Sequence, residues 1–289
     1  VARDLAARTE MLWRKGKSKA CQDTEEDIDP FTYTRRECIN LNLTPTCKVG
    51  PKQPPRVIVP AGKPLSQIKE IVSDLARIQT ENKDAQIEGL LVRIETEEDG
   101  KLLNDLCEAT AGALPFVIAE DAREEFGELP ASSNTIATPA LVVVRNFTSE
   151  KVVRLERFLW EANSSGKFAA IAIKPDDLNG PLGETLISHL GPPPIMTISE
   201  LSNFAHPVAA YRALTAGLGV KNLPFPIWIR SRDEARIQTK DDFFSSRLID
   251  ASILTGSLFC DGIGDLLSVE NETDPDRSRS LAYNLLQGT

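Results

Sequence analysis

The chain has few histidines, no Cys-x-x-Cys pair and no long apolar run, and each shortage excludes a class of protein. Its 2 histidines, His189 and His206, are predicted in or beside outer helices, which argues against a histidine-based metal centre or general base. No apolar stretch approaches the roughly twenty residues that span a bilayer, and Val1 begins no signal peptide. We therefore expect no membrane contact.

The 5 cysteines lie far apart in the sequence. Metal and cluster sites usually show at least one close pair, and none occurs among Cys21, Cys38, Cys47, Cys107 and Cys260. The simplest interpretation is a cytoplasmic protein with reduced thiols. We predict no metal ligand and no cofactor within this segment.

Acidic residues outnumber basic ones, 42 to 33, and the formal net charge is −9. This balance argues against a nucleic-acid-binding surface, so any phosphate ligand would be held by a local group of cations. The 41% of hydrophobic residues can bury a sizeable core within one large domain.

The first part of the chain reads as an arm. Residues 1–19 predict a helix, with apolar Leu5, Ala6, Leu12 and Trp13 and a basic end. A polar linker and a short strand over residues 31–38 follow, and then four prolines mark an irregular connector up to residue 55. We expect an arm over residues 1–55 and a folded domain over residues 56–289.

From Arg56 onward, short apolar runs alternate with helical patterns, which is typical of parallel β/α units. The runs predict eight strands, at 57–61, 90–94, 116–119, 141–144, 169–173, 195–198, 226–229 and 256–260. Eight strands at this spacing favour a (β/α)8 TIM-barrel-like fold, and an open doubly wound sheet is the alternative. A short helix over 121–127 and connections rich in glycine and proline predict a distorted barrel.

The stretch Gly256–Asp265 reads as strand, glycine turn and helix start. Gly262 and Gly264 allow a sharp turn, and Asp265 would accept hydrogen bonds from the free amides of the helix. Such a turn either holds a phosphate or closes a barrel without any ligand.

Active residues of barrels gather on the loops that follow the strands. Cations expected there are Lys63, Arg145, Lys174, Arg230 and Arg232, and together with Gly262, Gly264 and Asp265 they form the predicted phosphate-binding set. Acidic neighbours such as Glu120 and Asp121 offer the alternative that these cations form ion pairs within the chain. No residue is predicted to be catalytic.

Three motifs together resemble one family. They are Asp29–Glu37 (DPFTYTRRE), Asp261–Asp265 (DGIGD) and Ser280–Gly288 (SLAYNLLQG). They resemble the large, three-domain form of 4-hydroxy-3-methylbut-2-enyl diphosphate synthase, and specifically its inserted middle domain. The resemblance covers nearly the whole chain but is sharp only at these motifs.

The resemblance implies a parent oxidoreductase of isoprenoid biosynthesis by the methylerythritol phosphate pathway. That enzyme converts 2-C-methyl-erythritol 2,4-cyclodiphosphate reductively, with a four-iron four-sulfur cluster held in another domain. The implied partners are the flanking substrate barrel and cluster domain of the same polypeptide, and ferredoxin or flavodoxin as electron donor. The missing initiator methionine and the end at Gln287-Gly-Thr agree with a piece of a longer protein.

Within that parent, the segment would be non-catalytic and would position the cluster domain relative to the substrate barrel. Arg35 and Arg36 would belong to a docking arm between the two barrels, and the DGIGD turn would be the remnant of a duplicated barrel. Two alternatives remain open: a free-standing barrel enzyme or binding domain for a small phosphorylated ligand, and a docking module for the electron donor.

Overall fold

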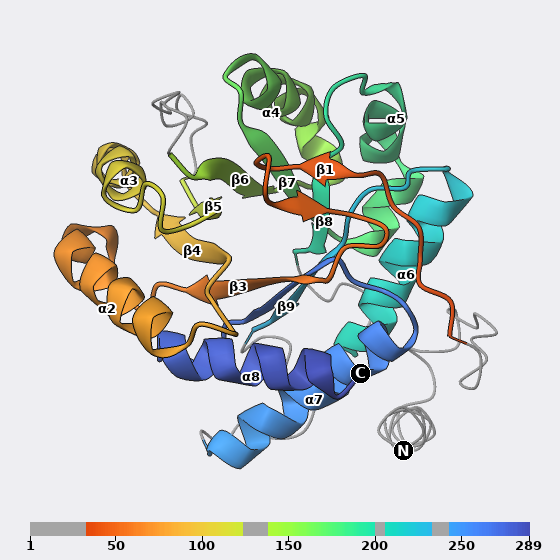
Figure 1. The fold of residues 1–289 in the computed structure, drawn as a ribbon. Helices are drawn as coiled ribbons and strands as arrows, with labels where there is room; N and C mark the ends of the chain where they lie inside the picture. Colours follow the sequence, from red (N-terminus) through yellow and green to blue (C-terminus); the bar gives the residue numbers. More distant parts are fainter. Residues whose placement is uncertain (1–32, 124–137, 200–205, 233–242) are drawn as a thin grey trace.

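Eight parallel strands form the centre of this computed structural model, which describes residues 33–123, 138–199, 206–232 and 243–289 (Figure 1). The strands are β3 (Arg56–Pro60), β4 (Gly89–Ile94), β5 (Phe116–Asp121), β6 (Ala140–Asn146), β7 (Phe168–Ile173), β8 (Ile195–Ile198), β9 (Trp228–Ser231) and β10 (Leu266–Val269). Their order in the sheet is β8-β7-β6-β5-β4-β3-β10-β9. A single parallel bridge between Met196 and Ile227 brings the two edges together. The result is a nearly closed barrel, which confirms the predicted fold class.

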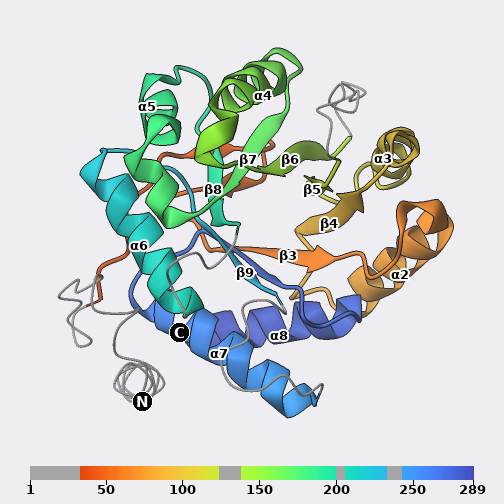
Figure 2. The ribbon, with the colours of Figure 1, turned by 180° about the vertical axis from the view of Figure 1, so that it is seen from behind.

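Within the described ranges, seven helices surround the strands, and Figure 2 shows them from behind. They are α2 (Ile68–Glu81), α3 (Glu97–Ala109), α4 (Val152–Ser164), α5 (Pro181–Ser188), α6 (Pro207–Val220), α7 (Phe244–Cys260) and α8 (Pro275–Gln287). Short 3-10 turns precede α2 and α4 at Leu65–Gln67 and Ser149–Lys151, and a third spans Pro175–Asn179. No helix among the described residues is long and apolar enough to cross a membrane.

The strands separate two apolar cores because their side chains alternate between the two faces. Val57 and Val59 face the helices, in the larger core, whereas Ile58 faces the barrel interior together with Phe116 and Trp228. Burying one such side chain contributes roughly 1.5–3 kcal/mol. The β-branched runs that predicted the strands thus supply buried side chains to both cores.

A small hairpin closes the amino-terminal end of the barrel. Its strands, β1 (Leu41–Asn42) and β2 (Lys48–Val49), pair antiparallel, and Leu41 and Val49 join the interior core. This hairpin belongs to the predicted arm, and residues 33–55 therefore pack on the barrel. The division at residue 56 stays a prediction, and the helix and linker expected over residues 1–30 lie outside the described residues.

Two predictions of secondary structure are wrong. Residues 256–260, expected as the eighth strand, are the end of α7, and the strand is β10, after the glycine turn. The last turns of α7 are buried nearly all round, so its apolar residues hide the helical period and resemble a strand. Residues 33–38 form no strand, since one backbone hydrogen bond, from Arg36 to Gly262, and the side chains of Arg35 and Arg36 hold them in place of a strand ladder. A helix is also expected at 121–127, but its first residue, Asp121, is the last residue of β5. The part of that helix from residue 124 onward lies outside the described residues.

Candidate functional site at the carboxyl end of the barrel

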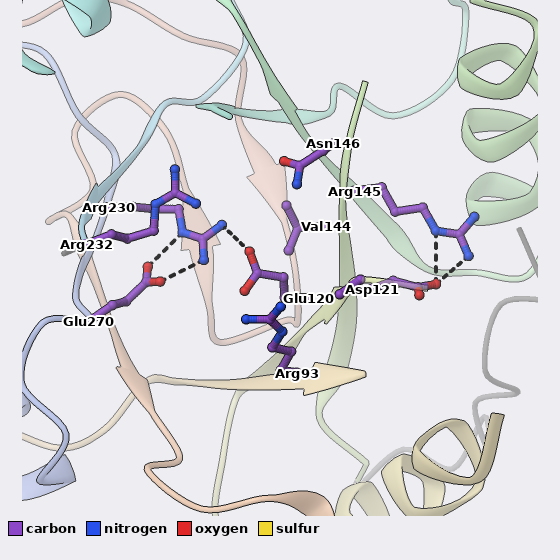
Figure 3. Close-up of a pocket in the computed structure, with 10 residues that line it drawn as sticks. Arg93, Glu120, Asp121, Val144, Arg145, Asn146, Arg230, Arg232 and Glu270 are labelled. Atoms are coloured by element: carbon purple, nitrogen blue, oxygen red, sulfur yellow. Dashed lines mark hydrogen bonds and ion pairs between the residues drawn. The ribbon is translucent and has the colours of Figure 1, made fainter. Parts of the chain in front are cut away.

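A cavity of about 320 Å³ lies at the carboxyl end of the strands (Figure 3). The strand register positions its polar lining, because Glu120 is aligned with Arg93 on one neighbouring strand and with Val144 on the other. Residues that are aligned in this way share a face of the sheet. The lining residues are Arg93, Glu120, Asp121, Ala122, Val144, Arg145, Asn146, Arg230, Arg232 and Glu270.

Arg230 is the centre of the cavity's charge network. Its guanidinium donates to both oxygens of Glu270 at 2.7 Å and lies 2.8 Å from Oε1 of Glu120. The group also lies over the ring of Trp228, 4.5 Å from its centroid, and only 1% of the side chain is exposed. One cation is thus compensated by two carboxylates within the barrel.

This network fixes the protonation states. Burial opposes the charge of Arg230, but Glu270 and Glu120 outweigh it and raise the pKa of the guanidinium. Burial likewise opposes the charge of Glu120, but Arg230 holds the pKa of that carboxyl below its usual value. A carboxylate held ionised in this way is a weak general base.

Two further arginines border the cavity. Arg232 donates to the backbone oxygens of Ile198 and Ser199, at 3.3 and 2.9 Å, and ties the end of β9 to β8. Arg93 lies 3.1 Å from Glu95, and both side chains are mostly exposed. An incoming anion would meet Arg93 at the entrance but would have to compete with Glu270 for Arg230.

Arg145 points away from this network, as Figure 3 shows. Its guanidinium pairs with Asp121, which also accepts from Arg123 at 2.8 Å, and it lies 5.3 Å from the ring centroid of Phe158 on α4. Successive side chains of a strand point to opposite faces, so Asp121, which follows the inward Glu120, points outward to where Arg145 lies. Burial opposes ionisation of Asp121, but the two arginines lower the pKa of its carboxyl.

The remaining predicted phosphate contacts lie elsewhere. Lys63 pairs with Asp74 of α2 at 2.7 Å, and Lys174 precedes the 3-10 turn that follows β7. The turn Gly262–Asp265 precedes β10 and therefore lies at the opposite end of the barrel. The structure thus brings together Arg230 and Arg232 around one charge network, with Arg145 on its outer side.

Asp265 has a structural environment in place of the expected helix start. Its carboxylate accepts from the backbone nitrogen of Ile227 at 2.9 Å, from the thiol of Cys38 at 3.2 Å and from Arg35 at 3.3 Å. Burial and Asp265 raise the pKa of Cys38 to about 12.

The basic pair also binds this chain's own barrel. Arg35 donates to the backbone oxygen of Gln53 at 2.5 Å, and Arg36 donates to those of Phe225 and Leu223 at 2.8 and 3.2 Å. The described contacts of both arginines thus attach the entering chain to the amino-terminal end of the barrel.

Sequence reasoning placed Asn146 at the rim that follows the strands but missed Arg93 and Glu270 in the cavity. The signal for Arg93 was a polar residue at an inward position of a strand. Glu270 was hidden because the eighth strand had been placed before the glycine turn. Among the described residues, no group of three or more His, Cys, Asp or Glu is suited to hold a metal ion.

Comparison of sequences finds one informative relative, and no family model matches the chain. The chain is 25% identical over 282 residues to 4-hydroxy-3-methylbut-2-en-1-yl diphosphate synthase (flavodoxin) of Chlorobaculum tepidum. The match covers 93% of this chain and 35% of that protein. The chain is therefore a distant homologue of part of the synthase and spans about a third of its length.

Comparison of structures supports the barrel. Dihydropteroate synthase of Xanthomonas albilineans matches with a TM-score of 0.54 and 12% identity, over 88% of this chain and 99% of that one. A sialic acid synthetase of Leptospira borgpetersenii reaches a TM-score of 0.48 at 12% identity, over 88% and 91% of the two chains. At such identities the likeness concerns the fold alone.

Proposed function

We propose that this chain is the inserted middle domain of a large diphosphate synthase of isoprenoid biosynthesis, and that it positions the neighbouring domains without taking part in the chemistry. One observation carries the proposal: Tyr33, which precedes the hairpin and the barrel, and Thr289, which follows the last helix, line the same small pocket. A domain inserted into another chain must leave close to where it enters, and adjacent ends make insertion tolerable.

The sequence relationship supports the same assignment. The similarity extends over nearly the whole of this chain but about a third of the synthase, as expected for one domain of several. In this proposal the flanking substrate barrel and a cluster domain, with four iron and four sulfur atoms, perform the reductive conversion of the cyclic diphosphate. Flavodoxin or ferredoxin supplies the electrons, and the enzyme works in the cytoplasm.

The charge network supports a non-catalytic role. Arg230 is already paired with two carboxylates, and Glu120 is held in its ionised form. Neither group is therefore poised to transfer a proton near neutral pH.

The test uses the full-length protein that contains this segment. Inserting three glycines after Gly288 should move the exit point and reduce turnover at least about tenfold, because misplacement by a few ångström weakens catalysis. The same insertion at Gly112, whose added Cβ would meet nothing within 4 Å, is the matched control and should leave turnover unchanged. Iron content and melting temperature should match in both variants.

Arg93→Ala and Asn146→Ala provide the opposing test at the cavity. Both variants should retain turnover within about twofold if the cavity is not a reaction site. Loss of turnover in a folded, cluster-containing Arg93→Ala protein would contradict the proposal.

A second candidate is a binding site for a small phosphorylated ligand, favoured by the convergence of Arg93, Arg230 and Arg232 on one cavity. Ligand at a hundred times its dissociation constant would stabilise the domain by about 2.7 kcal/mol. Phosphate and the cyclic diphosphate should each be tested by thermal shift, with Arg93→Ala as the control. A dock for the electron donor is disfavoured, because the net charge of −9 would repel an acidic partner.

A further inference from the structure

The outer surface of α4 carries two large apolar side chains that are exposed. Val153 is 78% exposed and Trp160 is 69% exposed, although the inner face of the same helix is buried. On the next helix, Ile187 near the end of α5 is 49% exposed, and Leu190, just after α5, is 100% exposed. Exposed apolar side chains that gather at one place mark an interaction surface.

The packing of the two helices brings these side chains together. Helix α5 packs beside α4, as Figures 1 and 2 show. A Cβ at Gly191, next to Leu190, would lie 3.5 Å from Nδ2 of Asn163. Asn163 lies about one turn beyond Trp160 on α4. The surface, called here the α4–α5 patch, consists of Val153, Trp160, Ile187 and Leu190.

Two charged residues lie between the apolar residues of α4. Glu156 and Arg157 follow Val153 by three and four positions and precede Trp160 by four and three, so the four side chains form one stripe along the helix. All four are exposed. The stripe therefore reads apolar, acidic, basic, apolar, and this order is complementary to its own reverse.

A second copy of the chain can supply that reverse order. A two-fold axis between Glu156 and Arg157 would place a second α4 antiparallel to the first. Val153 would then face Trp160 of the second copy, and each such contact would occur twice. Glu156 would likewise face Arg157 of the second copy. Arg157 now pairs with Glu161 of its own helix at 2.6 Å, but an exposed pair of this kind is weak and exchanges its partner easily.

The place of the patch favours a second copy over a neighbouring domain of the same polypeptide. Tyr33 and Thr289 line one pocket together with Leu286 of α8. Figures 1 and 2 show α8 and α4 on opposite sides of the barrel. Domains joined at Tyr33 and Thr289 would therefore meet α8 before α4.

We propose that the chain forms a weak homodimer through the α4–α5 patch, with the two α4 helices antiparallel about an axis between Glu156 and Arg157. One helix pair and its flanking residues bury less than about 1,200 Å², which is the size of transient interfaces. The expected dissociation constant is about 10–100 µM. Well below that concentration the chain is a monomer, and its unfolding does not involve this surface. The dimer goes beyond the proposed function and does not depend on it.

Sedimentation of the full chain over a concentration series tests the dimer. The mass of the unmodified chain should approach twice that of the monomer as the concentration rises through the expected dissociation constant. Trp160→Glu should raise that constant at least about tenfold. It should leave the melting temperature unchanged, because the side chain is mostly exposed. Ile249→Glu is the matched control, since Ile249 is an exposed apolar residue of α7, and it should leave the dimer unchanged.

Charge reversal tests the antiparallel register. Glu156→Arg would place arginines opposite each other across the axis, and Arg157→Glu would place glutamates there. Each variant alone should therefore dimerise at least about tenfold more weakly than the unmodified chain. An equimolar mixture of the two variants should form heterodimers with the original affinity, because every glutamate again faces an arginine.

Two results would overturn the proposal. One is a chain that stays monomeric at about 1 mM, well above the expected dissociation constant. The other is a dimer that Trp160→Glu and both charge reversals leave intact. A mixture of Glu156→Arg and Arg157→Glu that associates no better than either variant alone would contradict the antiparallel register.

Discussion

Tyr211 of α6 accepts a 2.8 Å hydrogen bond at its hydroxyl from the backbone nitrogen of Arg230 on β9. The same hydroxyl donates to the backbone oxygen of Trp228 and lies 3.1 Å from the hydroxyl of Thr197 on β8. In the described part of the chain, β8 meets the β9 side of the sheet through the single bridge from Met196 to Ile227, so this phenol connects the barrel at a weakly paired seam.

Replacing Tyr211 by Phe should therefore lower the free energy of unfolding by about 1–3 kcal/mol, because a buried amide and a buried carbonyl lose their partner. Urea titration measures the change. Tyr283→Phe is the matched control, since that hydroxyl also donates to a backbone carbonyl but at an exposed site, and it should cost about 0.5 kcal/mol. Equal losses in both variants would argue that Tyr211 does not hold the seam.

Arg230→Met should lower the free energy of unfolding by about 3–5 kcal/mol, because it leaves Glu120 and Glu270 without their cation. The triple variant with Glu120→Gln and Glu270→Gln should regain more than half of the loss. Arg157→Ala, which breaks an exposed pair with Glu161 on α4, should cost at most about 0.5 kcal/mol. Failure of the triple variant to recover stability would show that packing on Trp228, rather than charge, dominates.

Stability should fall in acid because of Glu120 and Asp121. The arginines lower the pKa of each carboxyl in the folded state, so the stabilisation is present above the unfolded-state pKa values of about 4 and is lost as the pH falls through the lower folded values. Urea midpoints measured between about pH 2 and 6 should show the slope. Asp121→Asn should flatten it, whereas the exposed Glu156→Gln should leave it unchanged.

Alanine at two glycines should separate backbone strain from steric conflict. Gly262 and Gly112 have φ of 76° and 75°, but a Cβ at Gly262 would lie 2.2 Å from the backbone oxygen of Thr34, whereas at Gly112 it would meet nothing within 4 Å. We expect a loss of about 1 kcal/mol for Gly112→Ala and more than about 3 kcal/mol for Gly262→Ala. Thermal unfolding followed by circular dichroism measures both. A similar loss of stability at the two positions would show that the backbone of residues 33–36 shifts easily to make room for the added Cβ at residue 262.

The sequence predicted the barrel because its strands are continuous β-branched runs, as at Leu141–Val144, bounded by clear helical patterns. The eighth strand was misplaced because the buried end of α7 resembles a strand in sequence, while the true strand, Leu266–Val269, has only four residues. Only the packing of the folded protein distinguishes the end of α7 from the strand β10.

The candidate site was less predictable. Position after a strand identified Arg230 and Arg232 but could not decide the direction of Arg145, which turns outward because its strand position alternates with the inward Val144. The hydrogen-bond partners of Asp265 are even harder to predict from the sequence, because Cys38 and Ile227 are separated from it by long stretches of chain.

The contacts of the entering segment have a consequence for biosynthesis. Arg35 and Cys38 bind Asp265, at sequence separations of 230 and 227 residues, and the hairpin that seals the barrel also packs on Leu266. At translation rates of about 5–20 residues per second, this segment is made roughly 10–45 s before its partners. The seal at the amino-terminal end thus cannot form until the ribosome has nearly completed the domain, and the nascent barrel stays open at that end throughout its synthesis.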